Sequence, residues 1–160
     1  MPLTGRGAVG LQLIADVLHL AGAAKVRVTG SSMLPCVLPG DILLVQREAI
    51  HDFALGDIAV FTRDDRLFAH RVVRRGASAT PSVITCGDAL TEPDQPVRSD
   101  DLLGRVDSII RGARRIHPAA TLLHRTASVV LRHSDFLTKC LLWLVGRARS
   151  FREMSECLTQ

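Results

Sequence analysis

Aromatic side chains are scarce in this chain. Its 160 residues include no tyrosine, one tryptophan and five phenylalanines. Because single-stranded nucleic acids stack their bases on aromatic rings, this scarcity argues against a surface of that kind. The net charge of +4 is modest and spread along the chain, so no dedicated nucleic-acid face is expected.

Metal-binding patterns are also missing. The four cysteines stand at positions 36, 86, 140 and 157, with no C-x-x-C spacing among them. No zinc motif combines them with the six histidines, and no histidine pair has the i,i+4 spacing suited to a metal. We therefore expect thiols kept reduced in an intracellular compartment, and no metal or other cofactor.

Long hydrophobic runs are absent as well. No apolar stretch approaches the roughly 20 residues that span a bilayer. The longest candidate, 136–145, contains Lys139, and Gln12, Asp16 and His19 interrupt the N-terminal apolar segment. No signal peptide is expected. The sequence predicts a cytoplasmic protein, with peripheral membrane contact through a basic C-terminal region as a further expectation.

The pattern that is present indicates a mainly β, α+β protein. The chain is long enough for one domain with a core, and 47% of its residues are hydrophobic. Apolar residues at helical spacing predict an amphipathic helix near 9–22 that stops at Gly22. Alternating or continuous apolar runs between turn residues predict short strands. These are 25–28, 42–45, 58–62, 67–74, 82–86 and 103–111, with a hairpin turn at 63–66 and loops at 76–81 and 91–101.

Three regions follow from this reading. An N-terminal helix covers 1–24, a β domain covers 25–112, and a basic helical region covers 113–160. In the last region, arginines flank apolar residues at helical spacing beyond Pro118. We expect helices that pack on the β core. A membrane surface or a partner protein is the alternative occupant of their basic, amphipathic face.

The candidate catalytic residues all lie within the region 25–112. Ser32 lies in a turn-rich stretch, and serine needs a base to accept its proton before it can act as a nucleophile. His70, in the predicted strand 67–74, is the candidate base. Asp88 and Asp94 follow and are candidates to orient the histidine. Asp41 and Asp57 are interpreted as turn residues.

Four blocks resemble the S24/S26 peptidases, the superfamily of signal peptidase I and of LexA-like self-cleaving repressors. They are Ser-Met-Leu-Pro at 32–35 with Pro-Gly-Asp at 39–41 after it, Gly-Asp-Ile-Ala-Val-Phe at 56–61, His-Arg-Val at 70–72, and Gly-Asp at 87–88. The resemblance covers about half the chain, from 28 to 106. Like the pattern of short strands, it implies a mainly β core, either a barrel or a folded-over β-sheet.

The resemblance also assigns roles. It makes Ser32 the nucleophile and His70 the base, as in the histidine-type endoplasmic-reticulum and archaeal branch, whereas bacterial relatives carry lysine at that position. Asp94 matches the loop in which that branch has its catalytic aspartate, and Asp88 remains the alternative. Ser31 and Met33 flank the nucleophile and are the candidates for contacts to the substrate or the oxyanion, Met33 as a packing residue beside the site.

Some positions depart from the family pattern. Gly30 replaces a small hydroxyl residue that can help to bind the oxyanion in signal peptidases, and Ser31 takes the place of a glycine. The oxyanion hole is therefore expected to use the backbone N–H of Ser32 and a second, unidentified donor. Cys36 replaces a threonine or serine, and Cys86 replaces a lysine. None of these changes removes a member of the triad.

The sequence therefore predicts a serine endopeptidase that cleaves an extended peptide or precursor protein through an acyl-enzyme. The resemblance implies recognition of the peptide beside a strand and a preference for small residues before the cut. Two alternatives stay open: a non-catalytic peptide-binding module, and a LexA-like regulator that cleaves itself. The candidate self-cleavage bond, Ala21–Gly22, lies only eleven residues before Ser32.

Overall fold

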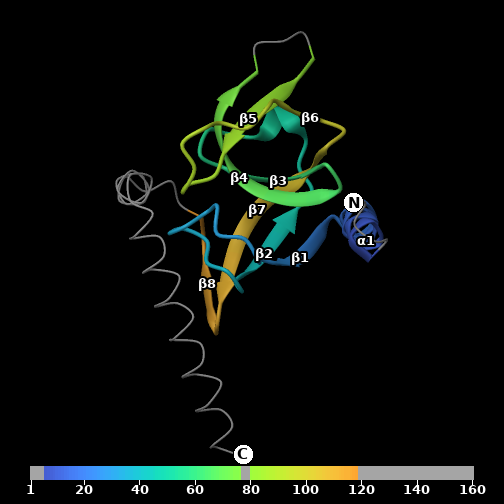
Figure 1. Ribbon diagram of the computed structural model, residues 1–160. Helices are drawn as coiled ribbons and strands as arrows, with labels where there is room; N and C mark the ends of the chain where they lie inside the picture. The colour runs from blue at the N-terminus through green and yellow to red at the C-terminus, as the bar shows by residue number, and fades with distance from the viewer. Residues whose placement is uncertain (1–5, 77–79, 119–160) are drawn as a thin grey trace, which may run out of the picture.

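An antiparallel sheet dominates the part of the chain that the computed structural model describes, residues 6–76 and 80–118 (Figure 1). Its strands follow the order β1-β2-β7-β3-β4-β5-β6, and β8 pairs with β7. One helix, α1, precedes the sheet. The predicted mainly β, α+β class is confirmed. The strands are β1 (Ala23–Arg27), β2 (Ile42–Gln46), β3 (Ile58–Arg63), β4 (Arg66–Arg75), β5 (Ser82–Cys86), β6 (Val97–Arg98), β7 (Leu102–Arg111) and β8 (Arg114–Ile116).

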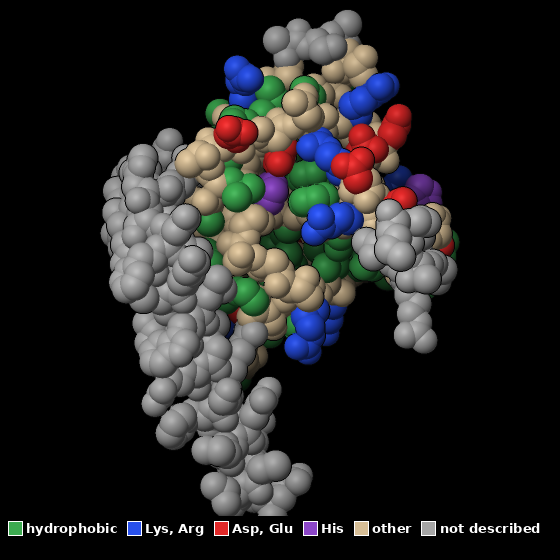
Figure 2. Space-filling model, in the orientation of Figure 1, with side chains coloured by type: hydrophobic (Ala, Val, Ile, Leu, Met, Phe, Trp, Pro, Cys, Tyr) green, Lys and Arg blue, Asp and Glu red, His purple; other side chains and the backbone are tan. Residues whose placement is uncertain are grey.

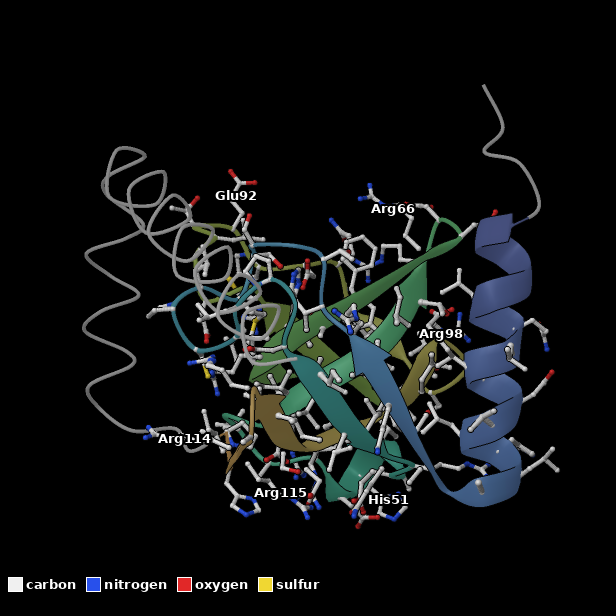
Figure 3. The ribbon with its side chains drawn as sticks, turned by 90° about the horizontal axis from the view of Figure 1, so that it is seen from below. His51, Arg66, Glu92, Arg98, Arg114 and Arg115 are labelled. Atoms are coloured by element: carbon white, nitrogen blue, oxygen red, sulfur yellow. The ribbon has the colours of Figure 1, made fainter. Side chains whose placement is uncertain are left out.

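Helix α1 (Arg6–Ala21) begins earlier than the predicted start at residue 9 and ends as expected. Its buried Leu18 packs into the core beside Val26 of β1. Gly22 then takes a φ of 72°, in the left-handed region that glycine adopts without strain because it has no Cβ. Its N–H donates to the Leu18 carbonyl at 3.0 Å and closes the end of the helix. Figure 3 shows α1 standing beside the sheet, with β1 leading away from its end.

Both faces of the central strand β3 are buried. Successive side chains of a strand point to opposite faces, so Ile58 and Val60 join the larger, main hydrophobic cluster, whereas Ala59 and Phe61 join a smaller second cluster. This explains why the sequence there is a continuous apolar run rather than an alternating one. Lys and Arg side chains are scattered over the described part of the face in Figure 2 rather than gathered in one patch.

The hairpin between β3 and β4 fixes the register of the candidate base. The predicted turn is confirmed, and its two central residues, Asp64 and Asp65, have φ of 49° and 54°. Positive φ at both central positions is typical of the tight turns that match the twist of a hairpin. In the resulting register, His70 of β4 pairs with Ala59 of β3.

Three short elements were not predicted. The segment 91–101, expected to be a loop, contains β6, whose buried Val97 pairs with Val83 of β5. A 3-10 helix, η1 (Ile50–Asp52), precedes β3. Strand β8 adds three exposed residues to the sheet beyond residue 112. Elements of two or three residues are too short to show a periodic pattern. The helices expected beyond Pro118 lie outside the described residues.

Candidate active site

Ser32 lies in the loop that joins β1 to β2. Two backbone hydrogen bonds close the base of this loop, from Val28 N–H to the Asp41 carbonyl and from Gly40 N–H to the Val28 carbonyl. Inside it, a single helical turn forms, in which Val37 N–H donates to the Met33 carbonyl at 2.9 Å. Both of those side chains belong to the main hydrophobic cluster. The loop is therefore anchored by its own core residues, which hold Ser32 in place.

Arg111 of β7 also holds this loop. Its guanidinium donates to the Asp41 carboxylate, at 2.7 Å for the shortest contact, and to the Cys36 carbonyl at 3.0 Å. Asp41 also accepts a hydrogen bond from Leu38 N–H, and Asp57 accepts one from Ala54 N–H. Each aspartate thus closes a local turn of four residues, which confirms how both were interpreted.

His70 lies on β4 with its side chain only 3% exposed. Its ring meets Phe61 and Phe68 edge to face, with centroids 6.0 and 5.8 Å away. Edge-to-face contacts of this kind are favourable and restrict the orientation of the ring. The imidazole is therefore held by packing as well as by its hydrogen bonds.

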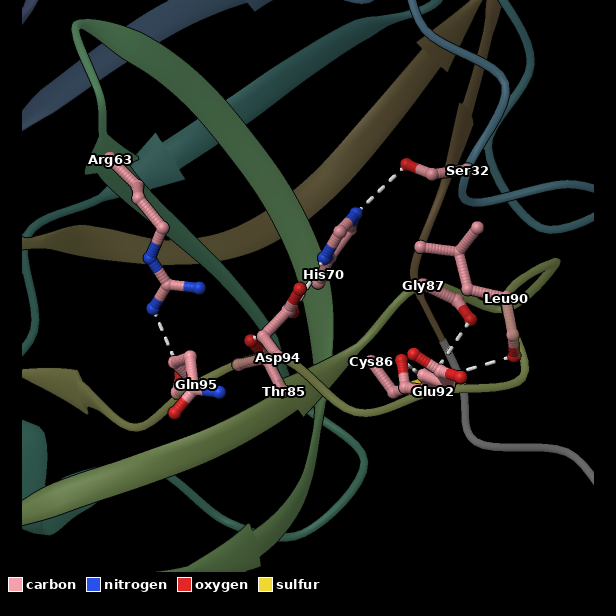
Figure 4. A network of polar contacts seen from close by, with 10 residues as sticks. All are labelled: Ser32, Arg63, His70, Thr85, Cys86, Gly87, Leu90, Glu92, Asp94 and Gln95. Atoms are coloured by element: carbon pink, nitrogen blue, oxygen red, sulfur yellow. Dashed lines mark hydrogen bonds and ion pairs between the residues drawn. The ribbon is translucent and has the colours of Figure 1, made fainter.

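A chain of hydrogen bonds joins Ser32, His70 and Asp94 (Figure 4). His70 Nε2 lies 2.9 Å from Ser32 Oγ, and His70 Nδ1 lies 2.6 Å from Asp94 Oδ2. An ionised carboxylate can only accept, so this pairing assigns the proton of a neutral imidazole to Nδ1. Nε2 is then the acceptor that faces the serine hydroxyl. The arrangement has the geometry of a nucleophile, a base and an orienting carboxylate.

Asp94 lies in the loop after β5, and that loop is tied closely to the strand. Asp94 N–H donates to the Thr85 carbonyl at 2.7 Å, and the Thr85 hydroxyl donates to Asp94 Oδ2 at 2.6 Å. The Cys86 thiol contacts the carbonyls of Leu90 and Glu92 in the same loop. Thr85 was not among the site residues predicted from the sequence. A hydroxyl residue between apolar neighbours in a predicted strand was the sequence signal that could have identified it. The structure buries all five residues of this strand.

Asp88, the alternative orienting residue, has a different partner. Arg71 binds it through two hydrogen bonds, from Nε to Oδ1 at 2.7 Å and from Nη2 to Oδ2 at 2.6 Å. A third hydrogen bond joins Arg71 to the Gly56 carbonyl. Burial lowers the pKa of Arg71, but the hydrogen bonds and charge of Asp88 outweigh it and raise this pKa above its ordinary range. The structure thus brings Asp94, and not Asp88, to His70.

The residues that flank Ser32 differ from each other in burial. Met33 is buried in the main hydrophobic cluster together with Cys36, as a packing residue would be. Ser31 is half-buried, and its carbonyl accepts a hydrogen bond from Leu34 N–H at 3.2 Å. The carbonyl of Ser32 accepts one from Ala89 N–H at 2.9 Å. The turn after β5 therefore contacts the backbone of Ser32 itself.

The part of the chain that the structure describes has neither a metal-binding cluster nor a membrane-spanning helix. No group of three or more histidine, cysteine, aspartate or glutamate side chains within 6–76 and 80–118 is arranged to hold a metal ion. In the same part of the chain, no helix is both long and apolar enough to cross a membrane.

Part of the chain is similar to a known peptidase family. Residues 9–80 match the family described as Peptidase S24-like. The match supports a relationship to the S24/S26 superfamily. It includes Ser32 and His70 but ends before the loop that carries Asp94. No curated protein matches the chain.

Proposed function

We propose that this chain is a serine endopeptidase in which Ser32 is the nucleophile, His70 the general base and Asp94 the orienting carboxylate. The observation that carries the proposal is the continuous hydrogen-bond chain from Ser32 Oγ to His70 Nε2 and from His70 Nδ1 to Asp94 Oδ2, at 2.9 and 2.6 Å. A buried histidine between a hydroxyl and a carboxylate is the arrangement that activates serine.

The chemistry follows from the positions of the protons. As Ser32 Oγ attacks the peptide carbonyl carbon, its proton passes to His70 Nε2, and Asp94 stabilises the imidazolium that forms. The negative charge on the carbonyl oxygen is stabilised by backbone donors, among which we propose the N–H of Ser32. Collapse of the tetrahedral intermediate breaks the C–N bond, and His70 returns the proton to the leaving amine. Water, activated by His70, then hydrolyses the acyl-enzyme and frees Ser32.

The proposed substrate is an extended peptide or a precursor protein. In the S24/S26 superfamily that the sequence resembles, a peptide is recognised through its backbone beside a strand, with small residues before the cut. We propose the same mode here, with Ser31 and Met33 beside the bound peptide. Met33 would act by packing, since its side chain is buried next to the nucleophile.

Cleavage of a peptide library, read by mass spectrometry, tests the proposal. Ser32→Ala and His70→Ala should each lower the rate by about 10³-fold or more, because serine and histidine act as one unit. The matched controls are Ser99→Ala and His51→Ala, since both residues are exposed. These variants should cleave as the wild type does. A folded wild type that cleaves nothing would overturn the proposal and favour a non-catalytic peptide-binding module.

Self-cleavage is the second candidate, since the matching family is the S24-like one and LexA-like repressors belong to that superfamily. The bond considered from the sequence, Ala21–Gly22, follows α1 directly. Gly22 is hydrogen-bonded on both sides, through its N–H to Leu18 and through its carbonyl to Arg47. These contacts argue against this bond as the substrate. Wild type that keeps its full-length mass after long incubation, as Ser32→Ala keeps its own, would exclude self-cleavage.

We also propose peripheral membrane contact through the basic C-terminal region. The support is its sequence, in which arginines between 111 and 152 flank apolar residues. Binding to vesicles that contain anionic lipid should weaken with salt and disappear when 119–160 are deleted. Binding that survives the deletion would overturn this part of the proposal.

A further inference from the structure

A second hydrogen-bond donor reaches the oxygen of Asp94 that His70 uses. The Thr85 hydroxyl donates to Asp94 Oδ2 at 2.6 Å, and His70 Nδ1 lies 2.6 Å from the same oxygen (Figure 4). Thr85 is fully buried in β5, whereas the Asp94 side chain is 16% exposed and lies on a loop. The buried strand β5 therefore supplies the hydrogen-bond donor, and the loop supplies the carboxylate.

The backbone of this loop is held by other contacts. Asp94 N–H donates to the Thr85 carbonyl at 2.7 Å, and Arg63 Nη2 donates to the Gln95 carbonyl at 2.8 Å. These two bonds fix the main chain but leave the carboxylate free to turn about its last torsion, which is broad for aspartate. The hydroxyl of Thr85 restricts this rotation of the carboxylate, because it donates a hydrogen bond to one of its oxygens.

Burial makes this hydroxyl an informative feature. A buried hydroxyl without a partner costs free energy, so an apolar residue is favoured in a strand interior unless a partner is present. Thr85 lies opposite Val72 in the sheet, and its neighbours in β5 are all buried. Valine has the same shape as threonine and suits a strand equally well. Valine would therefore satisfy the packing at this position, whereas only a hydroxyl can donate a hydrogen bond to the Asp94 carboxylate.

We propose that Thr85 is a positioning residue of the peptidase site. It acts through Asp94, whose carboxylate it holds in the rotation that accepts the Nδ1 proton of His70, and so keeps Nε2 available to Ser32. This inference rests on the proposed function, because positioning matters for catalysis only if the three residues form a working triad.

Thr85→Val removes the hydroxyl and preserves the shape. We expect kcat for the best-cleaved peptide of the library to fall about tenfold or more, because a hydrogen bond to a charged group is lost. KM should stay unchanged, because that hydrogen bond is made to Asp94 and not to the substrate. Thr85→Ser should retain kcat within about threefold, since it keeps the donor. The matched control is Thr62→Val on β3, because the Thr62 side chain bonds only weakly, at 3.4 Å, to the Asp101 carbonyl.

An NMR measurement separates this inference from the proposed function. The Nδ1–H proton of His70 should give a resolved signal in the wild type and in Thr85→Ser, and a broadened or shifted one in Thr85→Val. An unchanged signal in folded Thr85→Val, or an unchanged kcat, would overturn the positioning role. A wild type that cleaves no peptide, with a signal that still changes in Thr85→Val, would overturn the peptidase proposal and retain the role of Thr85 in orienting Asp94.

Discussion

An ideal Cβ on Gly87 would lie 2.7 Å from the backbone carbonyl oxygen of Ser32. The two backbones approach this closely because Ala89 N–H donates to the same oxygen at 2.9 Å. The turn that presents Ala89 is closed by a hydrogen bond from Leu90 N–H to the Gly87 carbonyl. The turn after β5 and the loop of the candidate nucleophile are therefore joined directly, and a glycine at 87 allows it.

Gly87→Ala should displace the nucleophile. A carbon atom 2.7 Å from a backbone oxygen is too close, and neither partner is the flexible end of a side chain, so the loop or the turn must move. We expect kcat to fall about tenfold or more, since small misplacements of reacting groups are costly. The free energy of unfolding should fall by about 1–3 kcal/mol, as for other overpacked sites. Peptide cleavage and urea unfolding measure the two effects.

Gly10→Ala is the control for this substitution. Gly10 lies within α1, where an added Cβ meets nothing within 4 Å. Alanine is the better helix former by about 1 kcal/mol, so this variant should be slightly more stable and fully active. Wild-type kcat in Gly87→Ala would contradict the role assigned to the contact.

Cys36 should react slowly with thiol reagents. Burial raises the pKa of its thiol, and the charge of Arg71 offsets only part of this effect. A raised pKa means less thiolate than in an exposed cysteine at the same pH, and the thiolate is the reactive form. Alkylation by iodoacetamide at pH 8 should therefore be at least about tenfold slower in the folded protein than in urea. Mass spectrometry of the peptide that contains Cys36 measures both rates, and equal rates would contradict the prediction.

The sequence predicted the strands that have a clear hydrophobic pattern. The run from Ile58 to Phe61 and the turn at Asp64 and Asp65 were enough to predict the hairpin that carries His70. The helix stop at Gly22 followed from the residue type. Strands β6 and β8 were missed, because two or three residues show no period and their pairing depends on the rest of the sheet.

The choice between Asp88 and Asp94 could not be made from residue patterns. Both follow β5 within a few residues, and both are carboxylates that can accept from histidine. The alternation of side chains along β4 separates them, since His70 and Arg71 are consecutive and point to opposite faces. Each then binds a different carboxylate, His70 that of Asp94 and Arg71 that of Asp88. Such a pairing depends on register and turn geometry, which only the folded chain provides.

Arg111→Ala should loosen the nucleophile loop. Asp41 is 1% exposed, and without Arg111 its carboxylate would be buried with no counter-charge. Because the Arg111 side chain is itself about one-third exposed, we expect a loss of about 2 kcal/mol in unfolding free energy, less than for a fully buried pair. The control is Arg74→Ala, since Arg74 is an exposed residue of β4 and should change stability by less than about 0.5 kcal/mol. Equal effects of the two variants in urea unfolding would contradict the prediction.

Asn substitutions at Asp94 and Asp88 should affect different properties: the first should lower kcat, and the second should lower the free energy of unfolding. In Asp94→Asn, the amide keeps the size of the side chain but removes the charge that stabilises the imidazolium and disturbs the tautomer of His70, so kcat should fall by about 10³-fold or more. Stability should change by about 1 kcal/mol or less, since the Thr85 hydroxyl can accept as well as donate and can still form a hydrogen bond with the amide.

In Asp88→Asn, the guanidinium of Arg71 stays buried without a counter-charge, because the two side chains are only 8% and 12% exposed. Breaking a buried pair from one side should lower the unfolding free energy by about 3 kcal/mol. The remaining folded enzyme should keep most of its kcat, since His70 and Asp94 are untouched. Urea unfolding and peptide cleavage, measured on both variants at a temperature where each is folded, separate the two roles. If Asp88→Asn abolished kcat and Asp94→Asn did not, Asp88 would be the functional partner of His70 and the triad proposed here would be wrong.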